Sequence, residues 1–305
     1  MCSLQTVVVT FFALHRPCWQ SAKHAQQWMT SLQTTVLPHL GHSPIGALSK
    51  VDILGAIGPV WVTHTDTAQR ALQRLRRVVV WAAARDMRPD HRPAMWEEIR
   101  RALPPASRLK PSRRHHPACD HQDIAQVLLA IASSASSSAV KGALTFTVLT
   151  AARPGEVRQM RWQEIDWRHA CWTIPAEHTK RRRAHRVPLS VQALALLKER
   201  QEQRTPSGLI FEAPSGRVLS GAGLLKALRS AGIDSSVHGL RSTMRDWAAE
   251  ETNYPRQVCE AALAHQAALG ETEGAYLRSD LFVRRRQLMQ DWADYCMPPC
   301  ISVAG

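Results

Sequence analysis

The chain has 305 residues, of which 45% are hydrophobic and 21% are charged. Such a composition excludes an intrinsically disordered chain, and the length allows two domains with a sizeable core. The 39 lysines and arginines outnumber the 25 acidic residues and give a net charge of +14, which favours a polyanionic partner, nucleic acid first, over a basic but unrelated enzyme.

The cysteines and the first apolar run exclude further classes. Seven cysteines, an odd number without a C-x-x-C pair, indicate neither a disulfide framework nor a metal site, and a reduced, cytoplasmic location fits best. The apolar run at residues 6–14 lacks a preceding basic region and is too short to span a bilayer, so we expect part of a first helix or strand there. No membrane segment is expected elsewhere.

Apolar spacing predicts an all-helical first domain over residues 1–103. Its expected helices cover residues 21–41, 50–57, 63–86 and 95–103. The second of them would be capped by Ser49, and the third would begin with Thr65 or Asp66 as its N-cap. A basic stripe on the outer face of the third helix consists of Arg70, Arg74 and Arg77.

A linker and a second domain follow. Residues 104–117 combine prolines, serine and cations without hydrophobic periodicity, which is typical of a linker. Residues 118–297 would form the second domain, and residues 298–305 a tail. Helical patterns in it cover residues 123–132, 141–152, 191–203, 221–232, 237–253, 256–263 and 282–295. Two strands at residues 172–174 and 185–189 flank a cationic tip, so the predicted fold class is mainly α with a small antiparallel β-sheet.

One arginine stands where a buried helix breaks, in LTAARPGEVRQMRWQEIDW (residues 149–167). Arg153 is followed by Pro154 and Gly155, and Glu156 opens the next helix near its positive end. Glu156 could therefore orient the guanidinium of Arg153. By themselves these residues fit a structural Arg–Glu pair as well as a functional site.

A second pattern is VHGLRSTMRDWAAEETN, at residues 237–253. His238 and Arg241 lie three residues apart, so on a helix they share one face. A proton-transferring group beside a permanent cation suits chemistry on an anion. The same pair also fits a solvated helix end, and these residues alone favour that simpler interpretation.

Taken together, these segments resemble the tyrosine recombinases, the phage integrase family. That family's first arginine motif resembles TAARPGEVRQMRWQEIDW, and its H-x-x-R motif resembles HGLRSTMRDWAAE. Its final histidine and nucleophilic tyrosine resemble LAHQ and then GAYLRSD, and its lysine-bearing hairpin resembles IPAEHTKRRRAHRVPLS. The likeness covers roughly residues 10–297. The closing YLRSDLFVRRRQLMQDWADYC is similar to integrases of satellite phages and genomic islands.

The resemblance implies a site-specific recombinase that cuts and rejoins DNA through a 3′-phosphotyrosyl intermediate, without ATP, metal or another cofactor. Tyr276 would be the nucleophile, because Tyr254 and Tyr295 do not neighbour the other motifs in family order. Arg153 and Arg241 would clamp the non-bridging phosphate oxygens with their planar donors.

The remaining roles also follow from the resemblance. His265 would donate a third hydrogen bond to the phosphate, and His238 would act in proton transfer, assisting Tyr276 or the phosphate. Lys180 would protonate the leaving 5′-hydroxyl, although the neighbouring arginines could shift the register of the hairpin. Glu156 would buttress Arg153.

The expected partners are double-stranded attachment sites, on which four copies of an otherwise monomeric chain exchange strands through a Holliday junction, together with an accessory excision factor. The cations predicted to contact DNA are Arg70, Arg74, Arg77, Lys110, Arg113, Arg114, Arg181, Arg182 and Arg183. The apolar side chains of the last helix would pack on a neighbouring copy or on their own domain. The alternatives are a DNA-binding remnant that no longer recombines and a type IB topoisomerase-like enzyme.

Two features depart from the family pattern. The branch usually carries an N-terminal arm-binding domain, whereas this chain begins almost directly at HRPCWQSAKHAQQW, so we expect a truncated integrase without accessory arm-site binding. The histidine motif reads LAH where LGH is commoner, a small change that should be tolerated.

Overall fold

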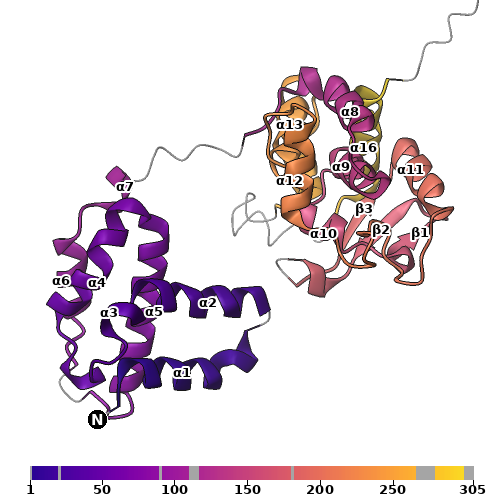
Figure 1. Ribbon diagram of the computed structural model, residues 1–305. Coiled ribbons are helices and arrows are strands. Elements are labelled where there is room, and N and C mark those ends of the chain that lie inside the picture. The colour runs from indigo at the N-terminus through magenta and orange to yellow at the C-terminus, as the bar shows by residue number, and fades with distance from the viewer. Residues whose placement is uncertain are drawn as a thin grey trace, which may run out of the picture. The chain divides into compact units, whose positions relative to one another are not determined.

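The chain folds into two compact units, residues 1–113 and 114–305, each built around its own hydrophobic core (Figure 1). The computed structural model describes residues 2–19, 22–88, 91–109, 117–179, 182–265 and 279–298. The predicted fold class is confirmed, because the described elements are mostly helices with one small antiparallel sheet. Among the described residues, no helix is both long and apolar enough to cross a membrane.

The first unit is all helical in its described part. Its helices are α1 (Leu4–His15), α2 (Ala22–Thr35), α3 (Leu37–Leu40), α4 (Lys50–Thr63), α5 (Thr65–Ala83), α6 (Met95–Ala102) and α7 (Ala106–Leu109). Helix α5 packs against α1, α2 and α4, and its apolar face is fully inside the core. The apolar run at residues 6–14 is therefore helix rather than strand.

The single helix expected over residues 21–41 is divided at Val36 into α2 and α3, and the ends of α4 and α5 also differ from the sequence expectation. Ser49 does cap α4 in a reciprocal capping box with Asp52, but the helix passes the expected end at Ile57 and continues to Thr63. The helix continues through Pro59, which has no backbone N–H to donate to the preceding turn. Trp61 lies one turn after the buried Ile57 and is only 4% exposed, and its burial outweighs that lost hydrogen bond.

The predicted N-cap of α5 is wrong. A single residue, His64, joins α4 to α5 and occupies the cap position without a side-chain cap. Thr65 is already helical, and its hydroxyl donates to the carbonyl of Trp61 at 2.9 Å. The tight connection between the helices therefore decides the helix start, and Asp66 follows inside the first turn.

The second unit surrounds one buried helix, α9 (Ser138–Thr150). The other described α-helices of the unit are α8 (Ile124–Ser133), α10 (Pro154–Arg158), α11 (Val191–Gln201), α12 (Gly221–Ser230), α13 (Gly239–Glu250), α14 (Arg256–Ala262) and α16 (Phe282–Cys296). Helix α9 contacts α8, α10, α11, α12, α13 and α16. This arrangement agrees with its nearly continuous apolar sequence, since a helix that is apolar all round must be buried.

The sheet has three strands in the order β1-β2-β3, all antiparallel: β1 (Ile165–Asp166), β2 (Cys171–Ile174) and β3 (His185–Pro188). The two predicted strands are β2 and β3, paired with Trp172 opposite Val187. The two-residue β1 was not expected, because it is too short to show an alternating pattern.

Helix α16 packs on its own unit. Leu288, Met289 and Trp292 are buried in the core of the second unit, and the Trp292 indole donates to the carbonyl of Val148 in α9 at 2.7 Å. Of the two expected packing modes for this apolar helix, the structure shows the one within the same chain.

Candidate active site

Arg153 stands at the break between α9 and α10. Helix α9 ends with Ala151 in the left-handed conformation (φ 49°), and Arg153 is the N-cap of α10. The buried Glu156 carboxylate accepts from the Arg153 backbone N–H at 3.0 Å and from its Nη1 at 2.8 Å. The expected Arg153–Glu156 pair thus forms, and it sets the direction of the guanidinium.

Arg241, in the first turn of α13, is 3% exposed. Its Nε donates to the carbonyl of Ala151 at 2.7 Å, and its Nη2 donates to the carbonyl of Leu263 at 2.6 Å. Its Nη1 is buried and has no hydrogen-bond partner within the described part of the chain. Burial and the nearby Arg153 cation lower the pKa of Arg241 to about 10, so it remains charged at neutral pH. A buried cation with a spare donor is costly unless an anion binds it.

The turn after α14 joins the two arginines. The carbonyl of Leu263 accepts from Arg241, and that of Ala264 accepts from Arg153 Nη2 at 3.1 Å. Ala264 has φ 51°, the left-handed region in which glycine is least strained. Glycine would adopt this backbone conformation with less strain, which is a reason for the commoner LGH form of the motif. In this chain alanine adopts it.

His265 follows that turn directly. Its backbone N–H donates to the Glu260 carbonyl at 2.8 Å, and its Nδ1 lies 3.2 Å from the Glu260 carboxylate. Burial and the cation of Arg241 lower the pKa of the imidazole below its ordinary value, despite the opposing charge of Glu260. The side chain remains 43% exposed.

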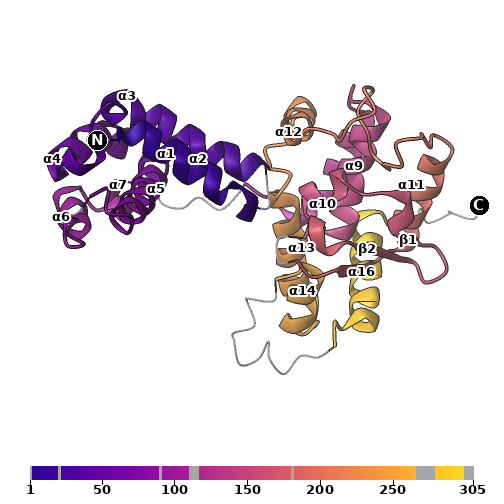
Figure 2. The ribbon, with the colours of Figure 1, turned by 90° about the horizontal axis from the view of Figure 1, so that it is seen from below.

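These groups border one pocket of about 400 Å³. Its lining residues are Ala118, His238, Arg241, Ser242, Arg245, Asp246, Leu263 and His265. Three predicted site residues, His238, Arg241 and His265, are thus brought together, and Arg153 is tied to the adjacent turn. Figure 2 shows α10, α13 and α14, the helices that supply them, in one region of the second unit.

Several predicted site residues lie outside the described residues. These are Lys110, Arg113, Arg114, Lys180, Arg181 and Tyr276. Arg182 and Arg183 are described, and both are exposed between β2 and β3. Their predicted contact with DNA stays a prediction.

The two other tyrosines have engaged hydroxyl groups. Tyr254 donates to the carboxylate of Asp291, and burial followed by that hydrogen bond raises the pKa of its phenol. The Tyr295 hydroxyl lies 2.9 Å from Nδ1 of the buried His121. Neither tyrosine is among the described residues that line the pocket.

Sequence reasoning missed two residues at the site. Arg245 lines the pocket, and its Nε donates at 3.1 Å to Glu260, which is only 7% exposed. Arg245 could have been found, because it lies one turn after Arg241 on the same helix face. The pairing of Glu260 with His265 is local, five residues apart, but its pairing with Arg245 could not be found in the sequence, because it joins α14 to α13.

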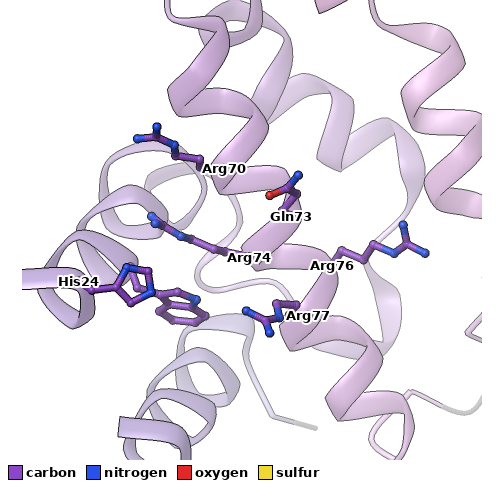
Figure 3. Close-up of a pocket in the computed structure, with 7 residues that line it drawn as sticks. His24, Arg70, Gln73, Arg74, Arg76 and Arg77 are labelled. Carbon is purple, nitrogen blue, oxygen red and sulfur yellow. The ribbon is translucent and has the colours of Figure 1, made fainter. Parts of the chain in front are cut away.

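The first unit carries a separate basic hollow of about 510 Å³ on α5 and α2. Its lining residues are His24, Trp28, Arg70, Gln73, Arg74, Arg76 and Arg77. Figure 3 shows Arg70 and Arg74 on the side of α5 that faces His24, whereas Arg76 points away from that side. Arg74 is held by the carbonyl of Gln27 at 2.7 Å and by the Ser31 hydroxyl. The structure therefore groups the predicted stripe and adds Arg76 and His24 to it.

Comparisons with known proteins agree over both units. The phage integrase central domain matches residues 4–99, and the phage integrase family matches residues 118–280. Among relatives, prophage integrase IntA of Escherichia coli K12 is 29% identical over 93% of this chain and 69% of its own length. The putative protein IntB of the same strain is 30% identical (90% and 72%), and the integrase of phage P4 is 29% identical (94% and 69%).

Solved structures share the fold. A lambda integrase (75–356) dimer bound to a COC′ core site has a TM-score of 0.65 at 15% identity, covering 92% of this chain and 96% of that one. The Tn1549 transposon integrase (82–397) in complex with circular intermediate DNA has a TM-score of 0.62 at 12% identity, covering 87% and 92%.

Proposed function

Since the chain belongs to the phage integrase family and is a site-specific tyrosine recombinase, we propose that it uses the pocket on α13 to hold the phosphate at which a DNA strand is broken. The observation that carries this proposal is the guanidinium of Arg241. It is buried, charged and held by two backbone carbonyls, and its Nη1 lacks a partner in the described structure. A phosphate oxygen is a partner of the right charge and geometry.

The other groups around the pocket complete a phosphate site. Arg153, oriented by Glu156, supplies a second planar donor set. His265 supplies a third donor. Fixed donors that meet charge as it develops on the phosphate stabilise the transition state without reorganisation.

Tyr276 is the proposed nucleophile. Its phenolic oxygen attacks phosphorus and forms a 3′-phosphotyrosyl bond while the bond to the 5′-oxygen breaks. His238 assists by taking the phenolic proton or by contacting the phosphate, and Lys180 gives a proton to the departing 5′-oxygen. The engaged hydroxyl groups of Tyr254 and Tyr295 support this assignment, since Tyr276 is the one other tyrosine in the chain. The reverse reaction with the 5′-hydroxyl of another strand rejoins the DNA.

The basic hollow on α5 and α2 is proposed to bind the DNA backbone. It gathers four arginines and a histidine on one unit. Because a lambda integrase tetramer has been solved bound to a Holliday junction, with a TM-score of 0.65 to this chain, four copies of this chain are proposed to exchange strands in the same kind of assembly. An accessory excision factor and a cytoplasmic location, where the DNA lies, belong to the same proposal.

Covalent trapping tests the proposal. The purified chain is incubated with nicked suicide substrates made from both ends of the element that carries its gene, and adducts are separated on denaturing gels. The native protein and the matched control Tyr254→Phe should both form an adduct, whereas Tyr276→Phe should form none, because only its nucleophile is missing.

Each other outcome has a definite meaning. An adduct with Tyr276→Phe would reject the assigned nucleophile. DNA binding without any adduct on the true ends would favour a remnant that no longer recombines. Relaxation of supercoiled DNA that lacks those ends would favour topoisomerase-like activity instead.

A further inference from the structure

Glu260 is a buried carboxylate with one partner on each oxygen. Its Oε1 accepts from Arg245 Nε at 3.1 Å, and its Oε2 lies 3.2 Å from Nδ1 of His265. At 7% exposure the carboxylate has little access to water. Arg245 lies on another helix, α13, so that contact is tertiary, whereas His265 lies five residues after Glu260, just past the end of α14.

We propose that Glu260 is a positioning residue for strand cleavage, which holds His265 through its Nδ1–H and is itself held by Arg245. This inference rests on the proposed function, because it concerns how His265 acts on the phosphate. Neither Glu260 nor Arg245 needs to touch the reacting atoms for this role.

The hold on His265 is double. The Glu260 backbone carbonyl accepts the His265 N–H, which fixes the chain, and the carboxylate accepts Nδ1–H, which fixes the ring. A ring exposed to 43% would otherwise rotate between several rotamers. With Nδ1 bound to Glu260, the other ring nitrogen, Nε2, is the one left for a ligand.

The charge on His265 decides what Nε2 can do. Donation from Nε2 while Nδ1 also donates requires the imidazolium form. Among the described residues, three charged groups act most strongly on the ring: Arg241 on α13 and Arg153 at the start of α10 disfavour that form, and Glu260 on α14 favours it. Arg245 and Asp246 line the same pocket. Glu260 therefore supports the protonated donor in a pocket that otherwise opposes it.

Arg245 has the opposite influence. It lies one turn after Arg241, lines the same pocket and is 28% exposed. By pairing with Glu260 it offsets part of the negative charge that His265 experiences. Removal of Glu260 and removal of Arg245 should thus move the protonation of His265 in opposite directions, which a purely structural role would not do.

The test compares Glu260→Gln with Arg245→Met in the full chain. In NMR titrations of ¹⁵N-histidine-labelled protein, assigned with His265→Asn, the midpoint of His265 should fall by about one pH unit in Glu260→Gln and rise in Arg245→Met. The pH above which single-turnover cleavage of a suicide substrate slows should be lower in Glu260→Gln and higher in Arg245→Met. Glu260→Gln should cleave about tenfold more slowly near pH 8, and Glu260→Asp should recover part of the rate.

The outcomes separate this inference from the proposed function. Folded variants whose His265 midpoints do not move, or move in the same direction, would overturn it. If Glu260→Gln does not fold, Arg245→Met decides alone, and a midpoint that fails to rise rejects the inference. If the native chain forms no adduct at any pH, the proposed function fails, while the titration still tests the coupling of Glu260 to His265.

Discussion

At the scale of single residues, Arg241 is the proposed phosphate ligand whose position the fold determines most fully. Two backbone carbonyls, from Ala151 and Leu263, orient its guanidinium, and one nitrogen is left over. Because the side chain is 3% exposed, that nitrogen cannot turn to bulk water. The cost of burying an incompletely paired cation is therefore retained in the free protein, and under the proposed function the bound phosphate relieves it.

The substitution Arg241→Lys should keep the positive charge but greatly slow DNA cleavage. A lysine ammonium cannot hold both carbonyls and a phosphate in the fixed geometry of the planar guanidinium. We expect the rate of covalent adduct formation to fall by about 100-fold or more, with DNA binding largely kept. The measurement is single-turnover cleavage beside a gel-shift titration. Arg229→Lys, exposed on α12, is the matched control and should cleave at the native rate.

At the scale of elements, β3 and the end of α14 meet at His185. His185 on β3 is half-buried, and burial, followed by the cations of Arg285 and Arg153, lowers its pKa to about 4. The backbone of Ala262, at the end of α14, accepts a hydrogen bond from its ring. A neutral histidine thus joins the sheet to the helix that carries Glu260 and leads to His265.

This contact predicts a loss of stability in acid. The folded-state pKa of about 4 lies below the ordinary value of 6.5, so between these values the unfolded chain binds a proton that the folded chain does not. The free energy of unfolding should fall as pH drops from 6.5 to 4, by up to about 3 kcal/mol from this group.

Urea unfolding at several pH values measures that effect. His185→Gln should be less stable than the native protein near pH 7 and should lose less stability on acidification. An identical pH dependence of the two proteins would show that His185 does not contribute. His169→Gln serves as the control, since His169 is exposed and its partner, Asp166, is exposed as well.

At the scale of the whole molecule, the net charge of +14 belongs to a chain of two compact units, for which separate tasks are proposed. In the second unit the proposed phosphate pocket has two arginines, of which Arg241 is buried and Arg245 is 28% exposed. In the first unit the arginines of α5 are mostly exposed around a wide hollow (Figure 3). Exposed cations bind a phosphate backbone by releasing counterions, so their contribution depends on salt.

The double variant Arg70→Gln and Arg77→Gln should weaken DNA binding and flatten its salt dependence. Each lost phosphate contact should reduce the slope of log affinity against log salt by about 0.9, so the pair should reduce it by about two. Gel shifts of the full chain at several salt concentrations measure the slope. Arg101→Gln on α6, an exposed cation away from the hollow, should leave it unchanged, and an equal loss there would reject the hollow as the DNA contact.

The local sequence pattern was sufficient to predict most helices and strands and the functional groups that lie in short motifs. Helical periodicity placed α9 and α13 because a helix buries one face or all of its faces whatever its neighbours are. Arg153 and Glu156 could be paired in advance, since three residues across a helix start suffice to bring them together. The end of α4 and the start of α5 could not be predicted, because the burial of Trp61 and the single residue between the two helices decide them.

The sequence by itself determined the family, the mainly helical fold class and the residue types available for chemistry on a phosphate. Only the tertiary structure decided which donors of Arg241 are occupied, that consecutive carbonyls at Leu263 and Ala264 hold two distant arginines, and that Glu260 joins Arg245 to His265. The physical reason is range. A motif records neighbours within one or two helical turns, as Glu260 and His265 are, whereas the bonds from Arg241 to Leu263, from Arg153 to Ala264 and from Arg245 to Glu260 join separate segments that only packing brings within 3 Å or so of one another.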